Sequence, residues 1–201
     1  MSEISRDGEV ALVTGTSSGM GMYAAVELAK AGARVIATMR DTGRSDRLRT
    51  AADAAGVALE VRALDVTDHA AAARLVEELT AEFGGVDVLV NNAGQGGVGT
   101  AEQLSMDQIR AQAEVNYFAP VHLAKLVLPG MRERGRGTIL TVTSVGGAVG
   151  QPFADAYCGA KFAVEGFMQS LAAVAERFGV HVRVIEPAAV ASDFVQNAVR
   201  P

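Results

Sequence analysis

Two residues with acid–base side chains, Tyr157 and Lys161, lie four positions apart in the segment 156–162 (AYCGAKF). Four residues make about one helical turn, so both side chains would lie on one face of a helix. They could form a catalytic pair, or they could be two amphipathic side chains on an ordinary helix, because this spacing arises often by chance. Cys158 lies about 100° around the helix from Tyr157 and is interpreted as a small packed residue rather than a nucleophile.

A glycine-rich loop is the second candidate site. In the segment 14–21 (TGTSSGMG), Gly15, Gly19 and Gly21 stand between an apolar run and a helical pattern. A dinucleotide site requires this context: Gly15 permits a tight turn, Gly19 lets backbone amides approach a pyrophosphate, and Gly21 lets the helix lie close to the sheet. A flexible loop is the alternative interpretation. The absence of a G-K-[ST] sequence argues against a nucleoside triphosphatase.

The end of the second apolar run bears on which dinucleotide would bind. An NAD site usually presents a carboxylate there, but this sequence has Met39 followed by Arg40. A methionine cannot accept hydrogen bonds from the ribose hydroxyls, whereas a guanidinium matches a 2′-phosphate. NADP is therefore favoured over NAD. Two alternatives stay open: Asp41 could reach the ribose if the turn is shifted, and Arg40 could be a solvated turn residue.

Short apolar runs alternate with longer helical patterns along the chain. The strands are expected at 10–14, 34–39, 57–64, 86–90, 138–142 and 180–185. The helices are expected at 19–31, 44–55, 68–83 (with Thr67 and Asp68 as caps), 103–132 and 155–178. Strands that are apolar on both faces and separated by helices predict an α/β fold with a doubly wound parallel sheet, a Rossmann fold. No linker divides residues 1–201, so a single domain is expected, with ligands at the carboxyl ends of the strands.

Composition excludes several classes of function. The chain is 49% hydrophobic and 20% charged, with a formal net charge of −5, which indicates a globular protein without a nucleic-acid footprint. One cysteine excludes an intrachain disulfide framework, and three dispersed histidines show no metal-ligand spacing. No metal site is expected. Residues 1–8 lack an apolar signal core, and no apolar run reaches the roughly 18 residues of a membrane span, so a cytoplasmic protein is expected.

Further motifs follow in order along the chain. They are 65–66 (DV), 91–94 (NNAG), Asn116, Ser144 and 187–192 (PAAVAS). Together with the glycine loop and the Tyr–Lys pair, they make the chain resemble the short-chain dehydrogenase/reductase family from about residue 8 to 195. Any one motif is modest evidence, but all of them occur in the expected order and structural context.

The resemblance implies an oxidoreductase that interconverts a ketone or aldehyde and an alcohol. Tyr157 would exchange a proton with the substrate oxygen, and Ser144, 13 residues earlier, would stabilise charge developing on that oxygen. Lys161 would hold the nicotinamide ribose and, with the oxidised nicotinamide, favour the phenolate of Tyr157. The dinucleotide contacts implied are Gly15, Ser17, Ser18, Gly19, Met20, Gly21, Arg40, Asp65, Val66, Asn92, Ala93, Gly94, Tyr157, Lys161, Pro187 and Val190.

Asn116 would complete the catalytic set. Pro120, four residues later, has no amide hydrogen, so the carbonyl of Asn116 should lose its helical partner and the helix should kink. A freed carbonyl could bind a water linked to Lys161, which matches the proton relay that the resemblance implies. A kinked packing helix without catalytic role is the alternative.

Some features point to the substrate class. Glu186, together with the segment 157–166 (YCGAKFAVEG), looks like the branch of the family that acts on steroids, retinoids and other lipophilic carbonyls. Apolar or small residues near the expected site are compatible with an apolar pocket, although they would also suit ordinary packing; they are Val145, Val149, Phe153 and Ala156. Ala188 replaces the family's usual glycine, which makes a positive φ there less comfortable.

The chain stops at Pro201, whereas family members usually continue through a loop over the substrate, another helix and a seventh strand. A truncated or absent lid is therefore expected, with the sixth strand at an exposed edge. The helices at 103–132 and 155–178 commonly form the interface of a homodimer or homotetramer in the family. Two other functions remain open: a non-catalytic redox-sensing regulator, and an epimerase or dehydratase that retains its cofactor.

Overall fold

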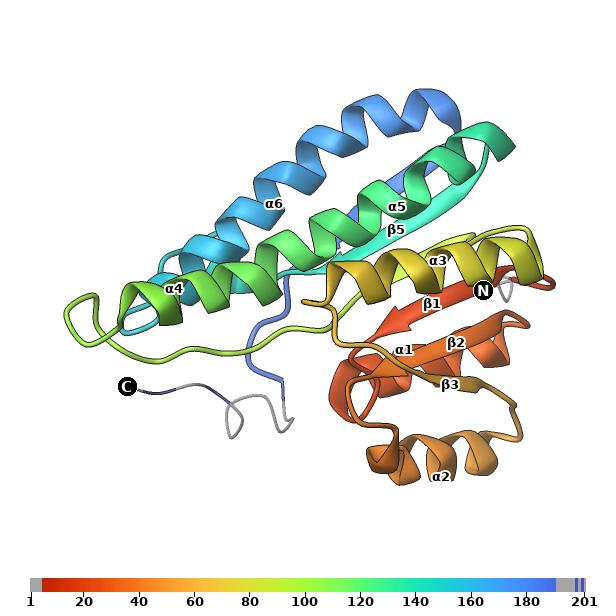
Figure 1. Ribbon diagram of the computed structural model, residues 1–201, viewed down its shortest axis with the longest axis horizontal. Helices are drawn as coiled ribbons and strands as arrows, with labels where there is room; N and C mark the ends of the chain where they lie inside the picture. Colours follow the sequence, from red (N-terminus) through yellow and green to blue (C-terminus); the bar gives the residue numbers. More distant parts are fainter. Residues whose placement is uncertain (1–4, 191–197, 199, 201) are drawn as a thin grey trace.

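A computed structural model describes residues 5–190, 198 and 200 (Figure 1). In these residues six strands form one parallel sheet in the order β3-β2-β1-β4-β5-β6. The strands are β1 (Val10–Thr14), β2 (Arg34–Met39), β3 (Glu60–Ala63), β4 (Val88–Asn91), β5 (Gly137–Val142) and β6 (Val180–Ile185). The helices are α1 (Gly19–Lys30), α2 (Asp46–Ala55), α3 (His69–Phe83), α4 (Met106–Ala113), α5 (Ala119–Arg134) and α6 (Asp155–Ala175).

The sheet confirms the doubly wound fold predicted from the apolar runs. After β3 the chain returns to the centre, where β4 pairs with β1 and Leu12 lies opposite Leu89. The connections from β1 and β4 therefore leave in opposite directions, which opens a crevice at the carboxyl ends of these two strands. The glycine loop follows β1, residues 92–94 follow β4 and Ser144 follows β5, so these motifs lie at that end of the sheet.

Alternating residues of the central strands pack against helices on opposite faces. Leu12 belongs to a core shared with α3, α5 and α6, whereas Val13 belongs to a core shared with α1 and α2. Figure 1 shows these two helical layers with the sheet between them. Burial on both faces explains why the strands read as continuous apolar runs.

The expected helix at 103–132 is instead built from three segments. Between α4 and α5 lies a π-helical turn, η2 (Glu114–Phe118), in which the amide of Ala119 donates to the carbonyl of Glu114 five residues back. Pro120, at the start of α5, has no amide to continue the regular α-helical pattern. The predicted irregularity at Asn116 is present, and it takes the form of a π turn, a feature frequent at functional sites.

Other boundaries differ slightly from expectation. Strand β3 begins at Glu60 rather than at residue 57, and α2 is preceded by a short 3-10 turn, η1 (Thr42–Arg44). Asp68 caps α3 as predicted, its carboxylate accepting from the amide of Ala71. Helix α6 continues into another 3-10 turn, η4 (Glu176–Phe178), so that the two together cover the expected range 155–178. In the part of the chain that the structure describes, no helix is long and apolar enough to cross a membrane.

Candidate active site

The carboxyl ends of β1 and β4 are joined by the side chain of Thr14. Its hydroxyl accepts hydrogen bonds from the amides of Asn92 and Ala93, each at 3.0 Å, and donates to the carbonyl of Val90 at 3.3 Å. The amide side chain of Asn92 in turn donates to the carbonyls of Thr14 and Gly15 at 2.9 and 3.0 Å. The glycine loop and the predicted motif at 91–94 therefore form one hydrogen-bonded unit.

Two glycines of this unit have no room for a side chain. Gly15 has a φ of +70°, and a Cβ there would lie 2.8 Å from the Cα of Ala93. A Cβ on Gly21 would overlap the side-chain nitrogen of Asn92 and lie 2.5 Å from the carbonyl oxygen of Gly15. Ser18, the N-cap of α1, makes no capping hydrogen bond through its side chain. The first amides of α1 are thus not covered by the cap, which fits a bound pyrophosphate.

Replacing Gly21 with alanine is expected to weaken NADPH binding by at least about tenfold, because the added Cβ forces the loop away from Asn92. The dissociation constant can be measured from the fluorescence of NADPH. Gly166→Ala on α6 is the matched control, since a Cβ there meets nothing within 4 Å. Equal affinities of the two variants would contradict this role for Gly21.

The residues predicted to distinguish NADP from NAD lie at the end of β2. Met39 is buried and Arg40 is exposed at the rim of the sheet. The carboxylate of Asp41 accepts from the amide of Gly43 at 2.9 Å and caps η1. Because that carboxylate is already used within its own turn, the geometry favours Arg40 over Asp41 as the residue facing a ribose.

The adenine position predicted at Asp65 and Val66 follows β3. Val66 is buried in the core, whereas Asp65 is exposed. One carboxylate oxygen of Asp65 accepts from the amide and the hydroxyl of Thr67, at 3.0 and 2.8 Å. These hydrogen bonds fix the turn between β3 and α3 at the crevice edge.

Ser144, Tyr157 and Lys161 meet at the carboxyl end of β5. Tyr157 and Lys161 are 8% and 5% exposed on α6. The Lys161 ammonium donates to the carbonyl of Val142 at 2.9 Å and lies 5.9 Å from the centre of the Tyr157 ring. The side chains of Ser144 and Tyr157 are hydrogen-bonded to each other, and the Ser144 hydroxyl also accepts from the amide of Gly146 at 3.0 Å. The tertiary structure thus assembles the predicted triad.

Burial controls the protonation of this triad. It raises the pKa of Tyr157, and the hydrogen bond with Ser144 only partly opposes that rise. Burial also lowers the pKa of Lys161 to about 8, against the opposing effect of the Glu165 carboxylate. In the chain by itself, Tyr157 is therefore a neutral phenol at neutral pH, suited to donating a proton. The expectation that Lys161 and an oxidised nicotinamide together favour the phenolate of Tyr157 stays a prediction.

The side chain of Asn116 makes several hydrogen bonds with the segments beside the triad. The side chain is 1% exposed and donates to the carbonyls of Gln95 and Gln112 at 2.9 and 3.1 Å, while its oxygen accepts from the amide of Gln95 at 3.2 Å. The Asn116 oxygen also lies 3.0 Å from where a Cβ on Gly94 would stand. Asn116 therefore fixes the loop that follows β4 beside the triad. A water relay through its carbonyl stays a prediction.

The segment after β6 closes the site on another side. The carbonyl of Pro187 accepts from the amide of Val145 at 3.0 Å, next to Ser144. Val190 is exposed at the end of this segment. Ala191 and Ser192, which complete the motif predicted there, lie outside the described residues.

Large apolar side chains are exposed in the segment that joins Ser144 to α6. Val149 and Phe153, in the loop between β5 and α6, are 61% and 63% exposed, and Val145, in the 3-10 turn η3 (Val145–Gly147), is 36% exposed. Phe153 has a φ of +63°, and its carbonyl accepts from the amide of Gly99 at 2.8 Å. This contact holds the loop between β4 and α4 beside the loop between β5 and α6.

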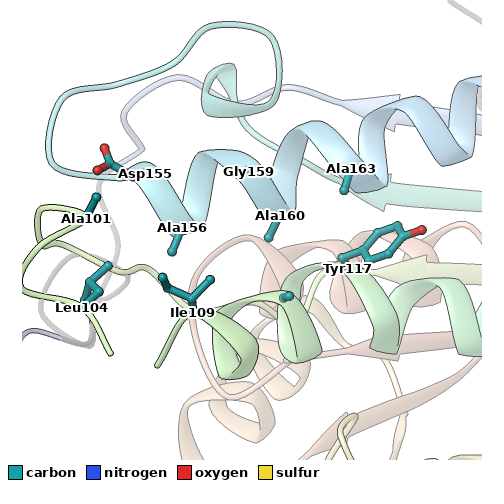
Figure 2. A pocket seen from close by; sticks show the side chains of 10 residues that line it. Ala101, Leu104, Ile109, Tyr117, Asp155, Ala156, Gly159, Ala160 and Ala163 are labelled. Carbon is teal, nitrogen blue, oxygen red and sulfur yellow. The ribbon is translucent and has the colours of Figure 1, made fainter. Parts of the chain in front are cut away.

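A cavity of about 350 Å³ lies on the neighbouring face of α6. Figure 2 shows Ala156 and Ala160 of α6 facing Ile109 of α4 across it, with Leu104 and Tyr117 along the same side as Ile109. Tyr157, Lys161 and Ser144 do not line it. The cavity is apolar and separate from the triad, although it shares the catalytic helix.

Some relevant residues escaped the sequence analysis. Thr14 was predicted only as the first residue of the glycine motif, and no role was predicted for Gln112, which is 3% exposed. Thr14 could have been identified from the sequence, because it is a polar residue at the end of an apolar strand. Gln112 offers a weaker one: it lies one helical turn before Asn116, and its side-chain oxygen accepts from Asn116 at 3.2 Å.

The structure also brings together two of the dispersed histidines. The rings of His69 and His122 stack at 4.4 Å between centroids, and His69 lies 2.9 Å from a carboxylate oxygen of Glu114. Among the described residues, no group of three or more histidine, cysteine, aspartate and glutamate side chains is arranged to hold a metal ion. Cys158 is buried, as its position on the helix predicted.

Comparisons with known proteins agree with this geometry. The chain is 42% identical to human retinol dehydrogenase 8 over 187 residues (91% of this chain, 59% of the relative). It is 41% identical to human 17-beta-hydroxysteroid dehydrogenase type 1 over 196 residues (94% and 59%). It thus spans about three fifths of the length of these relatives.

Among solved structures, a metagenomic short-chain oxidoreductase in complex with NADP superposes with a TM-score of 0.86 at 34% identity, covering 92% of this chain and 84% of that one. The sequence model of the family described as short chain dehydrogenase matches residues 9–201. With the sheet order, the glycine loop and the Ser–Tyr–Lys triad in place, the chain belongs to the short-chain dehydrogenase family.

Proposed function

We propose that the protein transfers a hydride between NADP and a ketone or aldehyde and its alcohol. The observation that carries this proposal is the placement of Ser144, Tyr157 and Lys161 together at the carboxyl end of β5. They lie beside the crevice whose glycine loop has an uncapped helix N-terminus. A nicotinamide bound there would supply the hydride, and the protein would orient the reactants.

Each residue of the triad has a defined task in carbonyl reduction. The neutral phenol of Tyr157 gives its proton to the substrate oxygen as negative charge develops on it. The hydroxyl of Ser144 donates a hydrogen bond to the same oxygen, so two donors stabilise the charge in a partly buried site. The ammonium of Lys161 would hold the nicotinamide ribose and would help to supply Tyr157 with a new proton.

A lipophilic carbonyl is the substrate class we propose. Val145, Val149 and Phe153 are exposed in the segment between Ser144 and α6, and an apolar substrate bound against this segment would remove them from water. Two relatives act on lipophilic compounds by name, a retinol and a 17-beta-hydroxysteroid. We also infer that the described fold is a single dinucleotide-binding oxidoreductase domain.

A panel of carbonyl substrates with NADPH and with NADH, using the full-length protein, tests the proposal. Oxidation of NADPH by lipophilic ketones or aldehydes is expected. Tight binding without oxidation by any member would favour the redox-sensing regulator. Turnover of substrate without net oxidation would favour an epimerase or dehydratase.

The preference for NADP rests on Arg40. Replacing Arg40 with leucine is expected to raise the dissociation constant of NADPH about tenfold or more while leaving that of NADH nearly unchanged, because only NADPH carries the 2′-phosphate. Arg132→Leu, at an exposed position near the end of α5, is the matched control. A clear preference of the unaltered protein for NADH would show that Arg40 does not select the cofactor.

A homodimer or homotetramer in the cytoplasm completes the proposal. Phe118 and Phe162, on the helical layer formed by η2 and α6, are 48% and 45% exposed, which favours burial against a second copy. The one cysteine is free, as suits a reducing compartment. Light scattering of the wild type and of a variant with both phenylalanines changed to serine tests the assembly. An unchanged mass would place the interface elsewhere.

A further inference from the structure

Glu165 is a buried carboxylate that the proposed reaction does not use. It lies on α6 one helical turn after Lys161 and is 5% exposed. Glutamate is almost never fully buried unless it has a partner. Its position therefore calls for a compensating charge or hydrogen bond.

The hydrogen bonds of Glu165 satisfy only half of its carboxylate. One oxygen accepts from the side-chain nitrogen of Gln169 at 2.9 Å. The other oxygen is buried, and no described residue hydrogen-bonds to it. Lys161, Glu165 and Gln169 thus follow one another at intervals of four residues along one face of α6, so the buried Glu165 lies one helical turn from the buried Lys161.

Other titratable groups on the neighbouring elements do not compete for this position. They are Asp107 and Arg110 of α4, Glu114 and Tyr117 of η2, His122, Lys125, Arg132, Glu133 and Arg134 of α5, Glu176 and Arg177 of η4, and His181 and Arg183 of β6. Every one of them is at least partly exposed, whereas Lys161 and Glu165 are both buried. Strand β5 and turn η3 contribute no titratable side chain.

We propose that Glu165 is a positioning residue whose buried carboxylate keeps the ammonium of Lys161 charged at neutral pH, an inference that rests on the proposed function. Opposite charges one helical turn apart attract more strongly in a buried site, because less water screens them. Glu165 is also the charge that opposes the effect of burial on the pKa of Lys161. Through Lys161, this carboxylate controls how firmly the nicotinamide ribose is held as the pH rises.

The protonation of Lys161 can be measured directly. The chain has three lysines, Lys30, Lys125 and Lys161. Selective isotope labelling of lysine side chains therefore gives few NMR signals, and Lys30→Arg and Lys125→Arg assign them. In the unaltered chain, Lys161 is expected to titrate with a pKa of about 8.

Glu165→Gln keeps the size of the side chain and its hydrogen bond with Gln169 but removes the charge. We expect this variant to lower the titration midpoint of Lys161 by about one pH unit or more. Glu165→Asp should give a midpoint between the two, and Glu77→Gln, an exposed position on α3, should leave it unchanged. An identical midpoint in wild type and Glu165→Gln overturns the proposal. If Glu165→Gln fails to fold, the Asp variant decides the question in the same way.

A second readout connects the charge to the site. The affinity for NADPH of Glu165→Gln is expected to fall severalfold between pH 6 and pH 8, while that of wild type falls less, and Glu165→Asp should recover most of the difference. A purely structural role would weaken binding equally at both pH values, which would contradict the proposal. Failure of the wild type to bind NADPH would refute the proposed function, yet the NMR titration would still report on Glu165.

Discussion

Replacing Tyr157 with phenylalanine is expected to lower the rate of carbonyl reduction by about 10²–10⁴-fold, the usual contribution of a positioned proton donor. The phenol is 8% exposed, is hydrogen-bonded with Ser144 and has a raised pKa, so it is protonated throughout the neutral range. Phenylalanine retains the ring and its packing but has no proton to give. Single-turnover kinetics with saturating NADPH measure the loss.

Cofactor binding separates this effect from a damaged fold. NADPH affinity of Tyr157→Phe is expected to stay within about threefold of wild type, because Lys161 and the glycine loop are unchanged. Tyr117→Phe is the matched control, since Tyr117 is partly buried and lines the separate cavity beside α6. Turnover by Tyr157→Phe at the wild-type rate would remove Tyr157 from the mechanism.

Replacing Lys161 with methionine is expected to abolish activity and at the same time to stabilise the fold by about 2 kcal/mol at pH 7. Burial lowers the pKa of Lys161 from 10.5 to about 8 even with Glu165 nearby, which corresponds to about 3 kcal/mol of unfavourable charge burial. Loss of the hydrogen bond to the carbonyl of Val142 offsets about 1 kcal/mol of the gain. Methionine fills the space of the lysine stem without a charge.

The pH dependence of this stabilisation has a defined sign. Below pH 8 both the folded and the unfolded chain hold the proton, so the full penalty of the buried ammonium is present. Between about pH 8 and 10.5 the unfolded chain binds more protons than the folded one, and stability contributed by this group rises with pH. The advantage of Lys161→Met should therefore shrink as the pH is raised from 7 to 9.5.

Urea unfolding at these two pH values measures the difference. Lys125→Met, at an exposed position on α5, is the control and should change stability by less than about 0.5 kcal/mol. A less stable Lys161→Met protein at pH 7 would show that the ammonium is favourable for folding. Such a result would also weaken the view that Lys161 is retained for function at the expense of stability.

Much of the fold could be predicted because its local signals agree with its tertiary environment. Val10–Thr14, Arg34–Met39 and Val180–Ile185 are strands with the predicted boundaries. Strands β1 and β2 are buried on both faces except at the exposed Arg34, so their other residues are apolar or are threonines whose hydroxyl donates to a backbone carbonyl. Strand β3 was predicted too long: its pairing with β2 begins at Glu60, opposite Ile36, so residues 57–59 precede the strand.

The site was predictable to the extent that chemistry required particular residue types at particular spacings. Tyr157 and Lys161 lie in successive turns of one helix, so their proximity follows from local geometry alone. The π turn at Glu114–Phe118 was only partly foreseen, since the missing amide of Pro120 implies an irregularity but does not select its form. The side-chain contacts of Asn116 with Gln95 depend on where the loop after β4 returns, and nothing in the sequence fixes that path.

By itself, the sequence determined which groups this protein carries and which of them share an element: a glycine turn before a helix, an arginine after a strand, and a phenol one turn from an ammonium. These local arrangements follow from the periodicity of helices and strands, which relates residues that are only a few positions apart. Only the tertiary structure decided what surrounds those groups. It joined Thr14 to Asn92, stacked His69 on His122, and buried Glu165 beside Lys161. Packing excludes water from particular side chains, and that exclusion, rather than residue type, sets the charge and the reactivity of Tyr157 and Lys161.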